Sequence, residues 1–302
     1  MNIIGHKYIF LSISALLVLA SAVCFLAWGL KPSIEFTGGS LMEVELQESG
    51  VPSVHPDPEK IQHALAELDL GTIVVQPAGN GALIRFKTVD EDTHQEIMRR
   101  LKLIVPDPAM LVEKRFDAIG PTIGRELKRR SLLAIALAVM AIVLYIAWAF
   151  RYVSRPLPSW KYGVVAIATL IHDVMIPTGL FAALGRFYAV EVDVLFITAI
   201  LTIMGFSVHD TIVVFDRTRE NLRKSKGQKP YDTVVNQSVN ETFARSLNTS
   251  LTVLLVLGAI IFFGGTSIYY FALALAVGIS FGTYSSIFVA SPLLVLWNDL
   301  TP

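Results

Sequence analysis

The chain has 302 residues, of which 53% are hydrophobic and 17% are charged, and its 25 acidic side chains balance its 25 lysines and arginines. Several apolar runs have about 20 residues, the length needed to cross a bilayer, which excludes a water-soluble globular protein and predicts an α-helical polytopic membrane protein. The single cysteine, Cys24, excludes a disulfide within one chain and a metal site built from cysteines.

Six membrane-spanning helices are predicted from the apolar runs. The apolar core of the first run is longer than the ~7–15 residues of a signal peptide. Residues 1–30 are therefore predicted to form a retained first transmembrane helix. In chain order the six predicted spans cover residues 8–30, 131–150, 162–183, 192–215, 241–263 and 270–297.

Residues 31–126 form the only large soluble part, and their pattern mixes strands with helices. Asp57 is a predicted N-cap with Pro58 at the first helical position, and the Gly-Asn-Gly of residues 79–81 is typical of a hairpin turn. The predicted order β-α-β-β-α-β indicates a ferredoxin-like domain. The predicted strands cover residues 40–46, 72–76, 82–87 and 110–116, and the predicted helices cover 58–68 and 93–103.

Three histidines are scattered through this domain, and no nucleophile, base or ligand cluster accompanies them. We therefore expect His55, His63 and His94 to be surface or packing residues rather than metal ligands.

The distribution of Lys and Arg over the short loops predicts the orientation in the membrane. On one side the short loops carry only Arg186, so both termini are predicted to be cytoplasmic and residues 31–126 extracytoplasmic. The basic residues 128–130 oppose this orientation, but they end a long domain, and long domains translocate largely regardless of charge. The basic residues on the predicted cytoplasmic side are Lys7, Arg151, Arg155, Lys161, Arg217, Arg219, Arg223, Lys224, Lys226 and Lys229.

Residues 127–302 are predicted to hold the five-helix remainder of the bundle, with a cytoplasmic amphipathic segment near residues 216–240. The basic first part of this segment either extends the fourth span or lies on the membrane surface. Its charges either hold the helix end at anionic headgroups or make a specific protein contact.

Asp210 is an ionisable residue inside an apolar span. Residues 194–204 before it are apolar except for Thr198 and Thr202, and residues 212–215 after it are apolar again. A charge at this depth would cost about 2.5–3.5 kcal/mol unless it is protonated, paired or facing a wet cavity. Intramembrane ionisable residues indicate ion or proton paths; the alternative is a neutral, hydrogen-bonded Asp that holds helices together.

Short motifs run through nearly the whole chain and together are highly specific. They are FTGGS at 36–40, GP at 120–121 with GREL at 124–127, HD at 172–173, DTIVV at 210–214 with DR at 216–217, REN at 219–221, Arg245 with TSLT at 249–252, and GTYSS at 282–286 with Ser291. In this order they resemble the SecF family, the smaller membrane subunits of the SecDF protein-export complex. His209 departs from the family pattern, which usually has Asn at this position.

The resemblance implies a six-span bundle of the resistance-nodulation-division type in the cell inner membrane, paired with a SecD subunit. Such a complex is understood to use the proton-motive force to assist late translocation of unfolded polypeptide through the SecYEG channel. Membrane lipids are further expected partners. No nucleic acid, cofactor, metal or enzymatic activity is expected.

Asp210 and Arg245 are the predicted proton relay. Asp210 lies seven positions before Arg217, or about 10 Å of helix inside the predicted cytoplasmic edge. Arg245 lies somewhat shallower near the start of the next span, where its long side chain could meet the carboxylate. The alternative is an Arg245 that extends to the membrane interface.

Three further polar residues lie near the predicted relay. Asp173, about 16 Å into its span, is predicted to be a structural hydrogen-bond acceptor rather than a second proton site, because no cationic partner is evident at a matching depth. His172 and His209 suit proton handling, and equally suit plain hydrogen bonding.

The last span carries a predicted packing face. Gly278 and Gly282 form a G-x-x-x-G pair with Ser285 and Ser286 one turn on, and such small residues let helices approach closely. We expect this face to pack against a helix of the same bundle or of the SecD-like partner.

Other classes of protein fit the sequence less well. A proton-coupled exporter of lipids or drugs would normally carry about twelve spans and two large outer domains in one chain. A structural membrane chaperone would need no titrating group. An intramembrane aspartyl protease is disfavoured because neither Asp173 nor Asp210 has the neighbouring glycine expected of one.

Overall fold

The computed structural model describes residues 1–302 except 47–56, 79, 106–107, 109–110, 151–157 and 301–302. It separates into two compact units, Pro32–Leu132 on the one hand and Met1–Lys31 with Leu133–Pro302 on the other. Each unit is described by itself.

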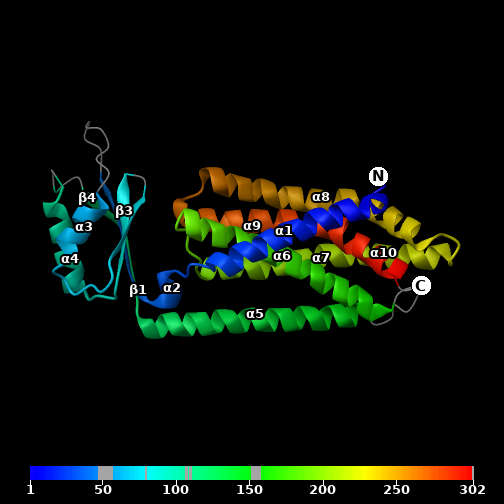
Figure 1. Cartoon of the computed structure of the whole chain (residues 1–302), viewed down its shortest axis with the longest axis horizontal. Coiled ribbons are helices and arrows are strands. Elements are labelled where there is room, and N and C mark those ends of the chain that lie inside the picture. Colours follow the sequence, from blue (N-terminus) through cyan, green and yellow to red (C-terminus); the bar gives the residue numbers. More distant parts are fainter. Residues whose placement is uncertain (47–56, 79, 106–107, 109–110, 151–157, 301–302) are drawn as a thin grey trace. The chain divides into compact units, whose positions relative to one another are not determined.

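The unit Pro32–Leu132 contains a four-stranded antiparallel sheet with two longer helices on one face (Figure 1). The strand order is β2-β3-β1-β4, so that β3 lies between β1 and β2. This is the ferredoxin-like arrangement that the pattern predicts. The elements are α2 Ile34–Thr37, β1 Gly39–Leu46, α3 Pro58–Leu65, β2 Val74–Ala78, β3 Gly81–Phe86, α4 Glu91–Leu103 and β4 Leu111–Ile119.

Local signals explain where the two longer helices begin. The carboxylates of Asp57 and Asp90 accept hydrogen bonds from the first turns of α3 and α4, and so satisfy donors that a helix start leaves free. Amphipathic faces of both helices then cover an apolar core that includes Leu65 and Leu101. His94 is a buried residue that stacks on Phe116, with ring centroids 3.9 Å apart.

The second unit is built from long helices that run side by side (Figure 1). Six helices among the described residues are long and apolar enough to cross a membrane, as predicted. They are α1 Lys7–Trp28, α5 Pro121–Ala149, α6 Ser159–Phe187, α7 Val194–Ser225, α8 Tyr231–Phe263, and a last span made of α9 Thr266–Ser285, a π-helical segment Ser286–Ala290 and α10 Ser291–Leu300.

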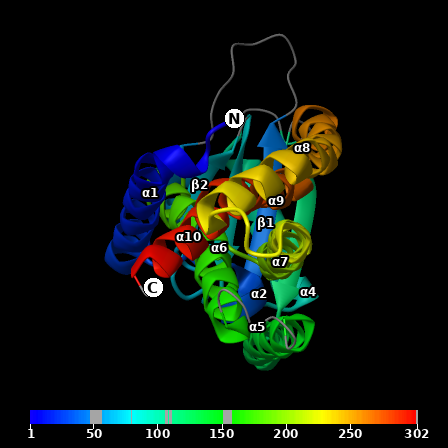
Figure 2. The same ribbon diagram turned by 90° about the vertical axis from the view of Figure 1, so that its right-hand side faces the viewer.

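The helices differ in how far this chain covers them. Within an apolar stretch of 18 residues in each span, at least half of the residues are buried in α6, in α7 and in the last span. The share of buried residues is 17% in α8 and only 6% in α1 and in α5. Figure 2 shows α1 at one edge of the bundle. Most of α1, α5 and α8 therefore presents apolar side chains that no described residue of this chain covers.

Both chain ends lie at the end of the bundle where α7 turns into α8 (Figure 1). The ammonium of Lys7 lies 2.5 Å from the carboxylate of Asp299, and the N-terminus donates a 3.0 Å hydrogen bond to Asn240. The segment 216–240 contains no separate surface helix, because its first part continues α7 and its last part begins α8. Lys226 and Gly227, with φ of 47° and 79°, make the turn between them.

Candidate functional site

Asp210 lies on α7 inside the bundle and is 7% exposed. Its Oδ1 accepts a 2.6 Å hydrogen bond from the hydroxyl of Ser246 on α8, and its Oδ2 accepts one of the same length from Ser286 in the π segment. Within the part of the chain that the structure describes, no Lys or Arg forms an ion pair with this carboxylate. Two hydroxyls take the place of a counter-charge.

Arg245 does not meet Asp210 in this structure, contrary to the predicted pair. Its side chain is exposed, while Ser246, the next residue, faces α7 and holds the carboxylate. Successive residues of an α-helix point about 100° apart, so the inward position of Ser246 turns Arg245 away. The predicted pair would need Arg245 on the face of α8 that meets α7, and that face carries Ser246 instead. Arg245 begins an exposed polar stripe with Asn248, Thr249 and Thr252.

Asp173 is the second buried carboxylate, fully enclosed on α6. Nδ1 of His172 lies 2.7 Å from its Oδ1, and its Oδ2 accepts hydrogen bonds from Ser207 of α7 and from Ser285 of α9, the latter at 2.7 Å. The structure thus supplies three hydrogen-bonding partners and no Lys or Arg among the described residues. Such an environment satisfies a buried carboxyl group through hydrogen bonds alone.

Two adjacent serines link the carboxylates. Ser285 is the last residue of α9 and bonds Asp173, while Ser286 begins the π segment and bonds Asp210. Each serine oxygen also lies within 3.0 Å of a carbonyl oxygen of its own helix, that of Gly282 or of Thr283. Short π-helical turns within α-helices are frequent at functional sites.

A serine with both a carboxylate and a carbonyl oxygen within hydrogen-bond distance suits a carboxyl group that gains and loses a proton. A carboxylate accepts the serine hydroxyl. Once protonated, it can donate to the serine oxygen while the serine donates to its own helix carbonyl. Neither protonation state leaves a buried polar atom without a partner, which would otherwise cost about 1–3 kcal/mol.

The glycine face of α9 packs against α7 within this chain. A Cβ added at Gly278 would lie 2.2 Å from the side chain of Ile203, and one at Gly282 would lie 3.4 Å from Cβ of Ser207 and 3.8 Å from the carboxylate of Asp173. Ser285 continues the same face toward Asp173. Because glycine has no side chain, α9 can approach α7 closely enough for Ser285 and Ser286 to reach the two carboxylates.

The two histidines lie in different environments. His172 is buried, and its Nε2 has no partner among the described residues, whereas His209 is exposed on α7. The structure therefore brings His172 to the carboxylates and leaves His209 outside. No group of three or more His, Cys, Asp and Glu with metal-binding geometry occurs in the described ranges.

The sequence pointed to neither Ser207 nor Ser246 as part of the site, and it indicated only a helix-packing role for Ser286. A signal for one of them was present, since hydroxyl residues recur on α8 at 238, 242, 246 and 250, which places them on one helix face.

These features define a polytopic membrane protein with a ferredoxin-like domain and two carboxyl groups buried among hydroxyls. The family model described as "Protein export membrane protein SecD/SecF, C-terminal" matches residues 106–300. The protein translocase subunit SecF of Thermobaculum terrenum is 40% identical over 309 residues, covering 99% of this chain and 94% of the relative. That of Anaerolinea thermophila is 38% identical over 301 residues, with the same two coverages.

A solved structure agrees with this match. The crystal structure of SecDF from Thermus, described as a translocon-associated membrane protein, superposes with a TM-score of 0.82 at 32% identity. The match covers 99% of this chain and 39% of the SecDF chain. The chain therefore belongs to the SecF family of protein translocase subunits.

Proposed function

We propose that the chain is a proton-motive-force-dependent auxiliary subunit of the Sec translocase, which assists late translocation of secreted proteins together with SecD. Family membership supports a part in Sec protein translocation, a transport role rather than an enzymatic one. The SecDF match supports SecD as a partner, because this chain corresponds to 39% of that longer protein. The SecYEG channel and an unfolded polypeptide are the further partners we propose.

The observation that carries the proton-coupled part is the setting of Asp210. A carboxyl group at membrane depth, held by two hydroxyls of which that of Ser286 can reverse its hydrogen bond, is able to change its protonation state. Moving one charge across 100 mV supplies about 2.3 kcal/mol. This energy is large enough to shift helix packing and so to drive movement of the domain at residues 31–126.

Arg245 supports a partner at the exposed face of α8. An arginine cannot realistically lose its proton, so at membrane depth its charge needs a carboxylate or water. The exposed stripe that Arg245 begins is otherwise polar, and its helix is little covered by this chain. We propose that SecD covers this stripe and that Arg245 is the cation of the relay, which Asp210 meets only after the helices rearrange.

Asp173 is proposed to be the structural member of the pair of carboxyl groups. Bonds from α7 and α9 and the contact with His172 make it a junction between three helices. The orientation proposed from the basic loops puts both termini and the α7–α8 turn in the cytoplasm and the ferredoxin-like domain outside, with the bundle in the inner membrane.

The test uses inside-out membrane vesicles that export a secretory precursor with and without an uncoupler. Asp210→Asn should insert and fold normally but lose the part of export that the uncoupler abolishes. Asp216→Asn, an exposed residue of the same helix that pairs with Arg219, is the matched control. Arg245→Met should behave like Asp210→Asn.

One result would overturn the proposal. If Asp210→Asn responds to the uncoupler as the parent protein does, Asp210 takes no part in proton coupling, and a structural membrane chaperone becomes the better account.

A further inference from the structure

A row of buried hydroxyls follows one face of α8. Ser238, Thr242, Ser246 and Ser250 are all buried and lie four residues apart. A four-residue interval keeps side chains on one helix face, one turn above another. Thr252, on another face of the same helix, is exposed. The four hydroxyls are therefore buried because they lie on the face of α8 that packs against other helices.

Two hydrogen bonds place this row against α7. Near the turn between the helices, the amide of Asn221 donates a 3.0 Å bond to Ser238, and deeper in the bundle Ser246 donates its 2.6 Å bond to Asp210. Asn221 and Asp210 are separated by 11 residues, or about 16 Å of helix. The row therefore runs from the hairpin end of the bundle to the buried carboxylate.

Thr242 occupies the middle of this path. Between the two bonded levels α7 offers Val214 and Phe215, which are fully buried apolar side chains, besides Thr218 nearer the turn. On α8, Thr242 is the one hydroxyl residue of the row between Ser238 and Ser246. Of the two helices, only α8 supplies a hydroxyl at this level, that of Thr242.

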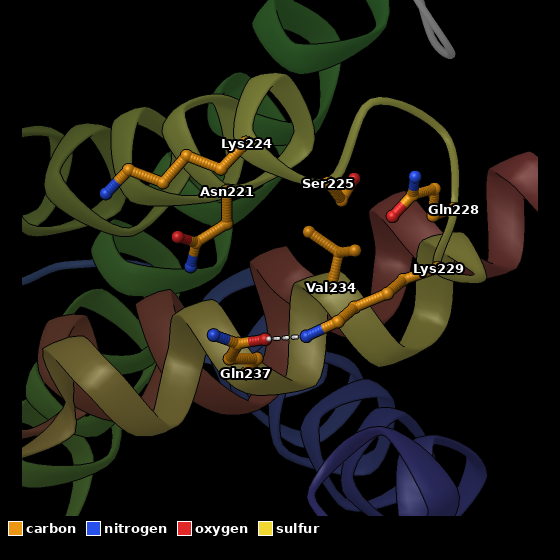
Figure 3. Close-up of a pocket in the computed structure, with 7 residues that line it drawn as sticks. All are labelled: Asn221, Lys224, Ser225, Gln228, Lys229, Val234 and Gln237. Carbon is orange, nitrogen blue, oxygen red and sulfur yellow. Dashed lines mark hydrogen bonds between the residues drawn. The ribbon is translucent and has the colours of Figure 1, made fainter.

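The outer end of the path opens into a polar pocket of about 210 Å³ (Figure 3). Asn221, Gln228 and Gln237 line this pocket with their amide side chains (Figure 3). The amide of Asn221 donates a 2.8 Å bond to Glu241, whose carboxylate also lies 2.5 Å from the guanidinium of Arg217. An acidic group thus lies beside Asn221, and the exposed side chains of Gln228 and Gln237 line the pocket. The pocket is lined by Asn221, Lys224, Ser225, Gln228, Lys229, Val234 and Gln237.

A polar atom at the inner end lacks a protein partner. The hydroxyl of Thr211, next to Asp210, is buried and has no hydrogen-bond acceptor or donor among the described residues. Unpaired buried hydroxyls are rare, and water commonly completes them. Water is therefore the expected partner of the Thr211 hydroxyl.

We propose that the seam of Ser238, Thr242 and Ser246, whose outer end is held by the hydrogen bond from Asn221, conducts protons between this pocket and Asp210. Hydroxyls one turn apart are about 6 Å from each other, a gap that one hydrogen-bonded water bridges. At each hydroxyl and each bridging water an O–H bond to the arriving proton forms while the original O–H bond breaks toward the next acceptor. The net change is one proton moved along the seam, with each hydroxyl turned. The inference rests on the proposed function, because Asp210 is the group that the seam loads or unloads.

A packing role for the same hydroxyls makes different predictions. Ser238 and Thr242 also donate to carbonyl oxygens of their own helix, which satisfies them without any conduction. If Thr242 only fills space, its methyl group matters; if it conducts, its hydroxyl matters. Two substitutions separate these properties.

The experiment measures proton-driven export and proton uptake in the same inside-out vesicles. Thr242→Val keeps the shape and removes the hydroxyl, whereas Thr242→Ser keeps the hydroxyl and removes the methyl group. We expect Thr242→Val to lower both rates about tenfold, which corresponds to a barrier raised by about 1.4 kcal/mol, and Thr242→Ser to remain near the parent rate. Thr202→Val, which removes an exposed hydroxyl of α7 that bonds only its own helix, should leave both rates unchanged.

The outcomes separate this inference from the proposed function. Loss of coupling in Asp210→Asn with normal rates in Thr242→Val would keep the proposed function and overturn the seam. A Thr242→Ser variant slower than Thr242→Val would also overturn it, in favour of packing. If Thr242→Val does not accumulate in the membrane, Ser238→Ala interrupts the same seam at its outer end and is measured with the same expectations.

Discussion

The ferredoxin-like domain buries apolar side chains under its sheet, whereas the helix bundle buries hydroxyls and carboxyl groups between its helices. Among the described residues, the polar side chains buried in the unit Pro32–Leu132 are those of Ser33, Ser40 and His94. The bundle encloses Asp173, Asp210 and a larger set of serines and threonines.

The difference follows from the two solvents. In water, removal of apolar surface stabilises the domain by about 25 cal/mol per Å². In lipid, apolar side chains gain little by leaving the surroundings, and helices associate through close packing and interhelical hydrogen bonds. Polar contacts therefore hold the bundle and supply its function at the same time, so substitutions in the two regions should differ in kind as well as in size.

The largest stability effect is expected from the apolar core of the domain. Leu101→Ala should destabilise the domain by about 2–5 kcal/mol, because it leaves a cavity where a side chain 1% exposed packs under the sheet. Leu103→Ala, on the same helix but 76% exposed, is the control and should change little. Hydrogen exchange of β1 and β3 in the full chain measures both, and equal effects would contradict an apolar core at this position.

A smaller effect is expected where two helices of the bundle touch through glycine. A Cβ at Gly179 of α6 would lie 2.4 Å from Cα of Ser21 in α1, so Gly179→Ala must displace backbone and should cost about 1–3 kcal/mol. At Gly163 of the same helix a Cβ would only make an ordinary 3.6 Å contact with Ile146. Thermal unfolding in detergent should separate Gly179→Ala from Gly163→Ala, and similar melting temperatures would show that α1 and α6 do not approach this closely.

Two buried serines of α8 can show whether Asp210 is charged in the resting protein. Ser246 and Ser250 are both buried on α8, but Ser246 bonds a carboxyl group and Ser250 the hydroxyl of Thr283. A hydrogen bond to a charged group contributes about 1.5–3 kcal/mol and a neutral one about 0.5–1.5 kcal/mol. Ser246→Ala should therefore destabilise the bundle more than Ser250→Ala does at neutral pH, whereas equal losses would indicate a protonated Asp210.

The smallest effect is expected at the surface of the domain. Hydrogen bonds from Arg99 and Arg100 lower the pKa of Glu96 to about 2. Because the folded pKa lies below the unfolded value of about 4.3, this contribution to stability is present above that value and disappears as pH falls toward 2. Glu96→Gln should thus lower stability slightly at pH 7 and not at pH 2. An equal difference at both pH values would rule out this linkage.

Hydropathy predicted the six spans because each needs a long apolar run, but several helices continue beyond the predicted spans, which for the fourth span was one of the two alternatives expected. α5 begins at Pro121, α7 continues to Ser225 and α8 begins at Tyr231, each about ten residues beyond the predicted limit. These extensions are polar and still helical, since good helix formers such as Arg and Glu continue a helix without an apolar face. The limit of a span is therefore not the end of its helix.

The candidate site could be predicted only in part. Asp210 was conspicuous because a carboxylate in an apolar run needs an explanation, whereas serines are ordinary in such helices and gave no comparable signal. The choice between Arg245 and Ser246 as its neighbour depends on the rotation of α8 about its axis, which tertiary packing determines. The sequence likewise offered two histidines, each directly before a carboxylate residue of the span. Only the packing of the helices determines that His172 is buried and His209 exposed.

The π segment Ser286–Ala290 changes the rotational phase of the last span. One additional residue in a turn rotates everything after it by about 100° relative to an uninterrupted α-helix. The glycines of α9 can then face α7 while Leu294 and Val295 of α10 remain buried against other neighbours. Deleting one residue from this segment would preserve the chemistry of both helices and yet turn one of them outward, so the packing of the last span specifies its residue count as well as its side chains.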